Sequence, residues 1–77
     1  MINPISLKDI RPGEKRCVQE ILTKDDMRRR LRDMGLIRGT EVECVGKSPG
    51  GDPMAFLIRG AVIALRAEDS GNILVGR

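Results

Sequence analysis

Residues 27–44 read MRRRLRDMGLIRGTEVEC, and the spacing of their apolar side chains changes from helical to extended along the stretch. Three apolar residues recur at positions i, i+4 and i+7: Met27, Leu31 and Met34. Such a stripe predicts a helix over residues 23–35. Thr23 or Asp25 can cap its start, and Gly35 suits its end. Further along the stretch, apolar and polar residues alternate, which indicates a strand with one face in water.

The rest of the chain divides into short extended segments between turn-forming residues. Residues 1–13 are expected to be extended, with three apolar side chains against the core: Ile5, Leu7 and Ile10. Beyond the strand that starts at Thr40, further segments are predicted: strands at 15–22 and 72–75, a hairpin at 54–65, a loop at 48–53 and one helical turn at 67–71. Five short strands and one helix describe a small closed β-barrel, and 77 residues form a single domain, residues 1–77.

The hairpin has a predicted register and an unusual outer face. If Gly60-Ala61 forms a two-residue turn, Ile58 lies opposite Ile63 and Phe56 opposite Leu65. One face then forms part of the core: Met54, Phe56, Ile58, Ile63 and Leu65. The other face is apolar where a wet sheet would be polar: Ala55, Leu57, Val62 and Ala64. We expect the opening segment or the helix to cover this face, and an exposed contact patch is the alternative.

The composition excludes several classes of function. The chain has no histidine, tryptophan or tyrosine, and Phe56 is its only aromatic residue. Without histidine it has no Ser-His or Cys-His nucleophile pair, and one phenylalanine cannot form a base-stacking platform. Its apolar runs are too short to span a bilayer, and its first 15 residues lack a signal-peptide stretch. We therefore expect a cytosolic protein that is not an enzyme.

Two motifs that could carry chemistry are weak. Cys17 and Cys44 lie 27 positions apart, which is not the spacing of a structural zinc site, and the simpler interpretation is two buried small side chains. A metal bound there would need carboxylates such as Glu14, Glu20 or Glu43. The sequence Gly46-Lys47-Ser48 resembles the end of a phosphate-binding loop, but Glu41 stands where that loop needs glycine.

The net charge of +3 is unevenly distributed, because residues 1–40 carry +4 and residues 41–77 carry −1. The helix holds a basic cluster: Arg28, Arg29, Arg30 and Arg32. Since the apolar stripe faces the core, Arg28, Arg29 and Arg32 should project into solvent. One interpretation is a solvated face that pairs with helix acids at three positions: Asp25, Asp26 and Asp33. The others are contact with an acidic protein surface, anionic lipid or nucleic acid, of which nucleic acid is the weakest.

The order of several short motifs resembles the FeoA family. The stretch from Arg30 to Val42, RLRDMGLIRGTEV, resembles the helix-to-strand signature of that family. Three later blocks resemble its loop and closing hairpin: Gly50-Gly51-Asp52-Pro53-Met54, Ile58-Arg59-Gly60 and Ile63-Ala64-Leu65-Arg66. The segments Leu7–Gly13 and Ile73–Val75 also fit, so the resemblance spans nearly the whole chain.

This resemblance implies an SH3-like β-barrel of about five strands with one short inserted α-helix. It also implies a small cytosolic accessory of ferrous iron uptake that works at the inner face of the cytoplasmic membrane. The implied partner is FeoB, a permease with a GTP-binding domain, so membrane contact would be indirect, with no nucleic-acid partner and no required cofactor. Similar domains end the DtxR-type metal-dependent repressors, but 77 residues leave no room for the rest of such a repressor.

The chain departs from the family pattern in the hairpin, where Ala61 replaces a commonly aromatic residue and Leu57 and Val62 replace commonly polar ones. Our hypothesis is that this face and the arginine surface contact the partner or a second copy of the protein. The predicted partner-binding residues are Arg28, Arg29, Leu31, Arg32, Leu57 and Val62. The alternative function is direct metal binding, as an iron chaperone or sensor that uses Cys17, Cys44 and carboxylates. Oligomeric state stays open.

Overall fold

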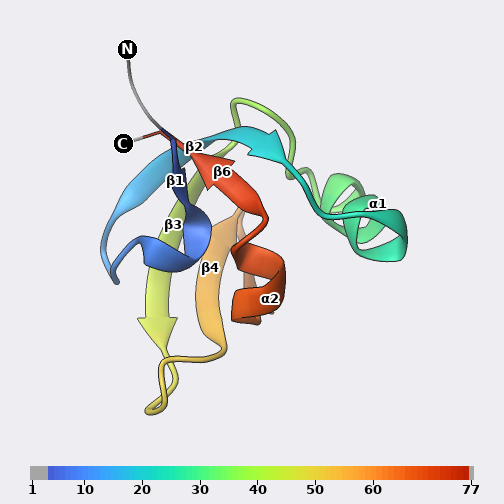
Figure 1. Cartoon of the computed structure of the whole chain (residues 1–77). Coiled ribbons are helices and arrows are strands. Elements are labelled where there is room, and N and C mark those ends of the chain that lie inside the picture. Colours follow the sequence, from blue (N-terminus) through green and yellow to red (C-terminus); the bar gives the residue numbers. More distant parts are fainter. Residues whose placement is uncertain (1–3, 77) are drawn as a thin grey trace.

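The computed structural model describes residues 4–76, which form one strongly curved antiparallel sheet with a helix set beside it (Figure 1). The strands are β1 (Ile5–Ser6), β2 (Lys15–Ile21), β3 (Glu41–Lys47), β4 (Met54–Ile58), β5 (Ala61–Leu65) and β6 (Ile73–Val75). The helices are the 3-10 turn η1 (Leu7–Asp9), α1 (Asp25–Asp33) and α2 (Ala67–Ser70). The strand order is β1-β6-β2-β3-β4-β5.

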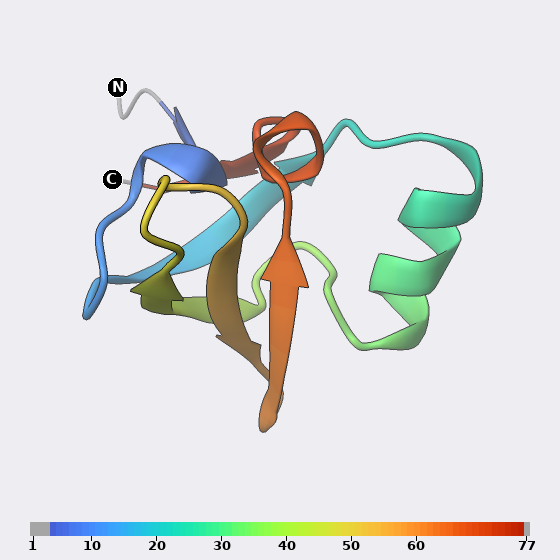
Figure 2. The ribbon, with the colours of Figure 1, turned by 90° about the horizontal axis from the view of Figure 1, so that it is seen from below.

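The architecture is the SH3-like type that the sequence predicts, with two corrections. The described chain has six strands rather than five, because part of the opening segment pairs with β6 as the two-residue strand β1. The sheet curves around its core but is not closed, since β1 and β5 are its two edges in the part of the chain described (Figure 2). A small curved sheet can still enclose a core if short segments cover its open side.

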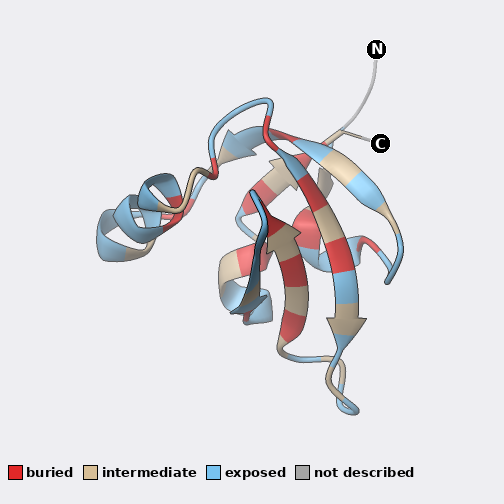
Figure 3. Cartoon of the chain, turned by 180° about the vertical axis from the view of Figure 1, so that it is seen from behind, coloured by how far each residue is buried: buried red, intermediate tan, exposed pale blue. Residues whose placement is uncertain are grey.

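The core lies on the concave side of the sheet. Alternate residues of β3 and β4 are buried, which produces the banded pattern along these strands in Figure 3. Phe56 is fully buried among aliphatic side chains from the sheet. Leu7 and Ile10 are also buried and Ile5 packs against the core, so the opening segment contributes to the core as predicted.

The hairpin turn lies one residue earlier than predicted. Arg59 and Gly60 form it, with φ values of 50° and 83°, and positive φ at both central residues is typical of a type I′ turn. Phe56 therefore lies opposite Ile63, which differs from the predicted register by two residues. Because a shift of two keeps every side chain on its face, the predicted core face is still correct.

The outer face of the hairpin is uncovered, which corrects the expectation that the opening segment or the helix would bury it. Val62 is 66% exposed, and Leu57, its cross-strand neighbour, is half-buried. Neither segment covers them, because β1 pairs with β6 at the opposite edge of the sheet from β5, and α1 stands away from the strands (Figure 1).

Helix α1 (Asp25–Asp33) is shorter than the predicted range 23–35, and Gly35 follows its end as predicted. It begins after Lys24, where the chain is still extended and no side chain makes a capping hydrogen bond, so neither Thr23 nor Asp25 caps the helix; Thr23 lies before it, and its Oγ1 atom has no partner among the described residues. At its end, Gly35 has φ of +92° and donates to the Arg32 carbonyl oxygen, while the Leu36 N–H reaches the Leu31 carbonyl oxygen at 2.9 Å. These two bonds form a Schellman motif, and Leu31 and Leu36 are both fully buried.

Candidate docking groove

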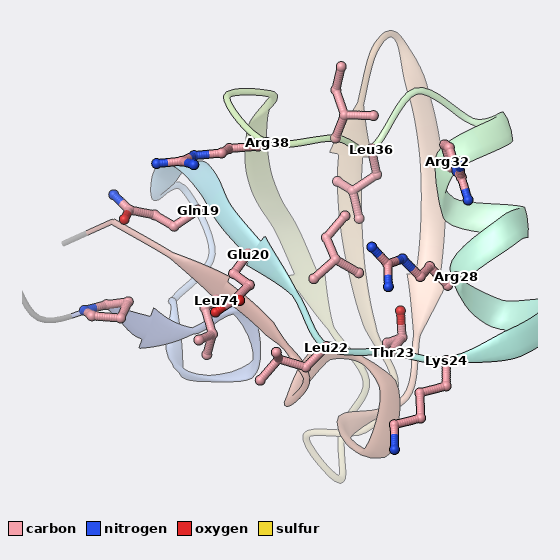
Figure 4. A pocket seen from close by; sticks show the side chains of 13 residues that line it. Gln19, Glu20, Leu22, Thr23, Lys24, Arg28, Arg32, Leu36, Arg38 and Leu74 are labelled. Carbon is pink, nitrogen blue, oxygen red and sulfur yellow. The ribbon is translucent and has the colours of Figure 1, made fainter.

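A groove of about 810 Å³ lies between α1 and the end of β2 (Figure 4). It exists because residues 22–40 leave the sheet, form the helix and return, so the helix stands off rather than packing flat on the strands. Its lining comes from five places in the chain: Pro4, Gln19–Lys24, Arg28 and Arg32 of α1, Leu36–Arg38, and Leu74 of β6.

Positive charges predominate among the charged residues that line the groove. Four cationic side chains contribute to it: Lys24, Arg28, Arg32 and Arg38. Glu20 is the one carboxylate in the lining. Within residues 4–76 the single ion pair joins Arg16 to Glu14 at 2.9 Å, so the predicted pairs between the helix arginines and Asp25, Asp26 or Asp33 do not form there. The cationic side chains of the groove therefore lack carboxylate partners in the described chain.

Exposed aliphatic side chains accompany these charges. Leu22 is 46% exposed and Ile37 is 47% exposed, and both line the groove. They are two of the four large hydrophobic residues that are exposed in the described chain, the others being Val45 and Val62. Single exposed aliphatic residues are ordinary, but two in one concave basic groove are typical of a contact site.

A buried hydroxyl group also lines the groove. Thr23 is only 5% exposed, and its Oγ1 atom has no hydrogen-bond partner among the described residues. In Figure 4 the hydroxyl points into the groove toward the guanidinium group of Arg28. Buried hydroxyl groups are nearly always paired, so the unpaired Oγ1 atom of Thr23 is an exception that a bound ligand would explain.

The structure separates the residues that the sequence analysis joined in one surface. Arg28 and Arg32 line the groove, whereas Arg29 is exposed on the helix outside it. Leu31 is fully buried and holds the helix to the core, so it has no surface to offer a partner, which corrects its place among the contact residues. Four groove residues outside the helix have no sequence signal that groups them with its arginines, because their proximity depends on how residues 22–40 leave and rejoin the sheet: Leu22, Thr23, Lys24 and Ile37.

The hairpin residues form a different surface. Leu57 lines a smaller hollow of about 430 Å³ together with Glu41, Glu43 and Arg59. Val62 lies beside Leu57 on β5. This hollow shares no lining residue with the groove.

The two cysteine residues lie on opposite faces of the sheet. Cys44 is fully buried in the core, whereas Cys17 is exposed and lies opposite Glu41 on β3. Residues 41 and 44 of one strand face opposite ways, so a single ion cannot contact both sulfur atoms in this arrangement. No group of three or more Cys, Asp or Glu side chains suited to a metal ion occurs in residues 4–76.

A curved antiparallel sheet with a helix inserted between its strands and a groove beside that helix define a small SH3-like domain. Residues 5–77 match the family described as the FeoA domain, so the chain belongs to the FeoA family, small accessory proteins associated with ferrous iron transport. No curated protein sequence matches the chain. In residues 4–76 no helix has the length and apolar character needed to cross a bilayer.

Solved structures agree with this assignment. The FeoA protein of Chlorobium tepidum is 28% identical with a TM-score of 0.88, covering 94% of this chain and 69% of that one. The FeoA-like protein of Clostridium acetobutylicum is 39% identical with a TM-score of 0.85, covering 97% and 87%. Stenotrophomonas maltophilia FeoA, described as a prokaryotic SH3 domain protein complexed with zinc, is 29% identical with a TM-score of 0.77, covering 92% and 88%. A manganese-dependent transcriptional repressor, 18% identical over 42% of its length with a TM-score of 0.84, shares the fold alone.

Proposed function

We propose that this chain is a cytoplasmic accessory that docks on FeoB, the membrane permease with a GTP-binding domain, and regulates or scaffolds it. The family membership supports a role in ferrous iron transport. The chain has no histidine and one aromatic residue, so it is poorly equipped for catalysis and better suited to binding another molecule. Its attachment to the membrane would be indirect, through the partner.

The observation that carries the proposal is the groove beside α1. Unpaired cations and exposed aliphatic side chains lie together in a concave site. A surface of this kind gains from contact with a partner, because its charges lack partners and its apolar side chains are wet in the free protein. The cations would also speed association with an acidic partner surface.

A pull-down of this protein with full-length FeoB and with its soluble GTP-binding domain tests the proposal. We expect the full-length permease to be retained, and retention of the soluble domain as well would place the contact there. If neither is retained at low ionic strength, the proposal fails. Rates of GTP hydrolysis and nucleotide release, measured with and without the protein, would then distinguish regulation from scaffolding.

The hairpin face is the competing docking surface. The exposure of Val62 beside Leu57 favours it, and it could contact the permease or a second copy of the chain. Leu57→Asp should leave permease binding unchanged if the groove is the docking site. Arg29→Glu tests the helix surface outside the groove in the same way, and sedimentation of both variants measures the oligomeric state.

Direct metal binding is the second candidate function, and the exposed Cys17 beside Glu41 is the feature that favours it. Equilibrium dialysis against Fe²⁺ without oxygen measures it directly. Stoichiometric retention that is lost in Cys17→Ser would support an iron chaperone or sensor. Retention that survives Cys17→Ser but is lost in Cys44→Ser would require the core to rearrange, because Cys44 is buried.

A further inference from the structure

We infer that the groove beside α1 recognises an acidic, extended peptide segment of a partner protein that carries aliphatic residues next to its carboxylates. Arg28 and the hydroxyl group of Thr23 would bind a carboxylate, and Leu22 and Ile37 would contact the aliphatic side chains. The identity of that partner as the permease rests on the proposed function, whereas the chemistry of the segment rests on the groove.

The charge of the lining selects an anion. Lys24, Arg28, Arg32 and Arg38 line the groove against the single carboxylate of Glu20. Arginine binds carboxylates through two parallel N–H donors, and such charge-assisted bonds are about twice as strong as neutral ones. A cationic ligand would meet repulsion from all four side chains.

The unpaired hydroxyl group of Thr23 marks where the anion would sit. Its Oγ1 atom is buried, has no partner in the described chain, and points into the groove toward Arg28. Leaving a buried hydroxyl group unpaired destabilises the free protein, so a ligand oxygen there would recover a bond that the fold leaves unmade. Thr23 and Arg28 thus offer two donors toward one place, one neutral and one charged.

The apolar part of the groove favours a peptide over other anions. Leu22 and Ile37 are nearly half exposed within the lining, and a free phosphate ion would leave both in water. A bilayer surface is flat, whereas Thr23 and Leu36 are buried at the bottom of a concave site that headgroups on a flat surface do not reach. A peptide segment can enter such a groove and supply both carboxylate and aliphatic side chains.

Fluorescence anisotropy with the intact chain tests the inference. The probe is a labelled, acetylated hexapeptide that alternates glutamate and leucine, compared with a glutamine–leucine peptide and a glutamate–serine peptide. We expect the glutamate–leucine peptide to bind at least tenfold more tightly than either control, because each control lacks one of the two matched chemistries. Equal binding of all three peptides would overturn the inference.

Matched variants locate the site. Arg28→Gln should weaken peptide binding about tenfold, while Arg29→Gln, which removes the same charge from the same helix outside the groove, should change it less than about twofold. Equal losses would show that only net charge matters and would overturn the inference. Both residues are exposed, so neither change should prevent folding.

Thr23→Val separates a binding role from a structural one. Valine keeps the shape and removes the unpaired hydroxyl group, so the thermal midpoint should stay constant or rise, while peptide binding weakens about threefold to tenfold. Lower thermal stability with unchanged peptide binding would mean that the hydroxyl group serves the fold, and would contradict the inference.

Three further measurements separate the other occupants and the proposed function. Binding to phosphatidylserine vesicles but to no peptide would assign the groove to membrane, and self-association abolished by Arg28→Gln would assign it to a second copy; either overturns the inference. If the permease binds but the acidic peptide neither binds nor competes, the inference fails and the proposed function stands. If the peptide binds in the groove and the permease does not bind, the inference stands and the proposed function fails.

Discussion

Gly35 joins the helix to the hairpin at a single residue. Its φ of +92° is the left-handed conformation that ends α1, and a Cβ atom there would lie 3.1 Å from Cδ of Arg59. The Nε atom of Arg59 donates to the Gly35 carbonyl oxygen at 3.4 Å. The absence of a side chain therefore serves two purposes, since it permits the turn and makes room for Arg59 from the distant β4–β5 turn.

Gly35→Ala should destabilise the protein by more than Gly39→Ala. Both glycine residues have φ near +90°, and the strain of alanine in that conformation is about 1–2 kcal/mol at either position. Only Gly35 has a close neighbour, whereas nothing lies within 4 Å of a Cβ atom at Gly39. Urea unfolding of the two variants gives the comparison, and equal losses would show that Arg59 moves aside without cost.

Glu14 should make the stability of the fold depend on pH in the acid range. Its carboxylate accepts a hydrogen bond from the Arg11 N–H at 2.6 Å and pairs with Arg16, so its pKa is lowered from the ordinary value of 4.5 in the folded protein. A lowered pKa stabilises the fold above pH 4.5, and this contribution is lost as pH falls through the folded pKa. As the pH drops below 4.5, the free energy of unfolding should therefore fall less in Glu14→Gln than in the wild type. The same dependence of the free energy of unfolding on pH in both proteins would contradict a role for Glu14.

At the scale of the elements, α1 is attached to the sheet by few side chains. Leu31 is its only fully buried residue, Met27 and Met34 are partly buried, and Leu36 follows directly in the Schellman motif. The rest of the helix is exposed, because residues 22–40 extend away from the strands (Figure 1). The groove thus depends on one apolar anchor and one C-terminal motif.

Leu31→Ala should loosen the helix before the sheet. Removing a buried leucine side chain costs about 2–5 kcal/mol, and here the loss falls on a helix in which no other residue is fully buried. Hydrogen exchange should show faster exchange of α1 amides than of β3 and β4 amides. Arg30→Ala is the matched control, because Arg30 is exposed in the same turn. Uniform loss of protection across the chain would mean that helix and sheet unfold together.

The extent to which the sequence predicts this molecule depends on the range of the interactions. The apolar stripe of α1, the alternation along β3, and the glycine at the end of the helix are local signals, and each is confirmed. The hairpin register was wrong by two residues, because Arg59 accepts positive φ, which the sequence pattern assigns to glycine. The pairing of β1 with β6 was the least predictable feature, because a strand of two residues gives no periodicity.

The candidate site also depends on interactions of short and long range, and only the short-range part is predictable from the sequence. Arg28 and Arg32 could be singled out from their spacing, because a helix with a buried stripe must expose its other face. Leu22 and Ile37 could not be linked to them, because 15 positions separate the two and only the path of the chain brings both to the groove. Burial of Thr23 without a partner has no sequence signal at all.

At the scale of the whole molecule, four of the ten cationic side chains of the first 40 residues line one groove. The net charge of +3 is modest, yet Lys24, Arg28, Arg32 and Arg38 all line that groove, and no ion pair involves them in the described chain. The hairpin hollow on another surface has two glutamate residues and one arginine instead. The chain is therefore polarised, and a partner that docks by charge should meet the helix side.

The affinity of the Arg28→Glu/Arg32→Glu double variant for FeoB tests the central claim most directly, with Arg29→Glu as the control. We predict that the double variant loses at least about a hundredfold in affinity for the permease, since two charge-assisted contacts are reversed, whereas Arg29→Glu loses less than about fivefold. Circular dichroism should show both variants folded, because all three residues are exposed. Wild-type affinity in the folded double variant would contradict docking through the groove.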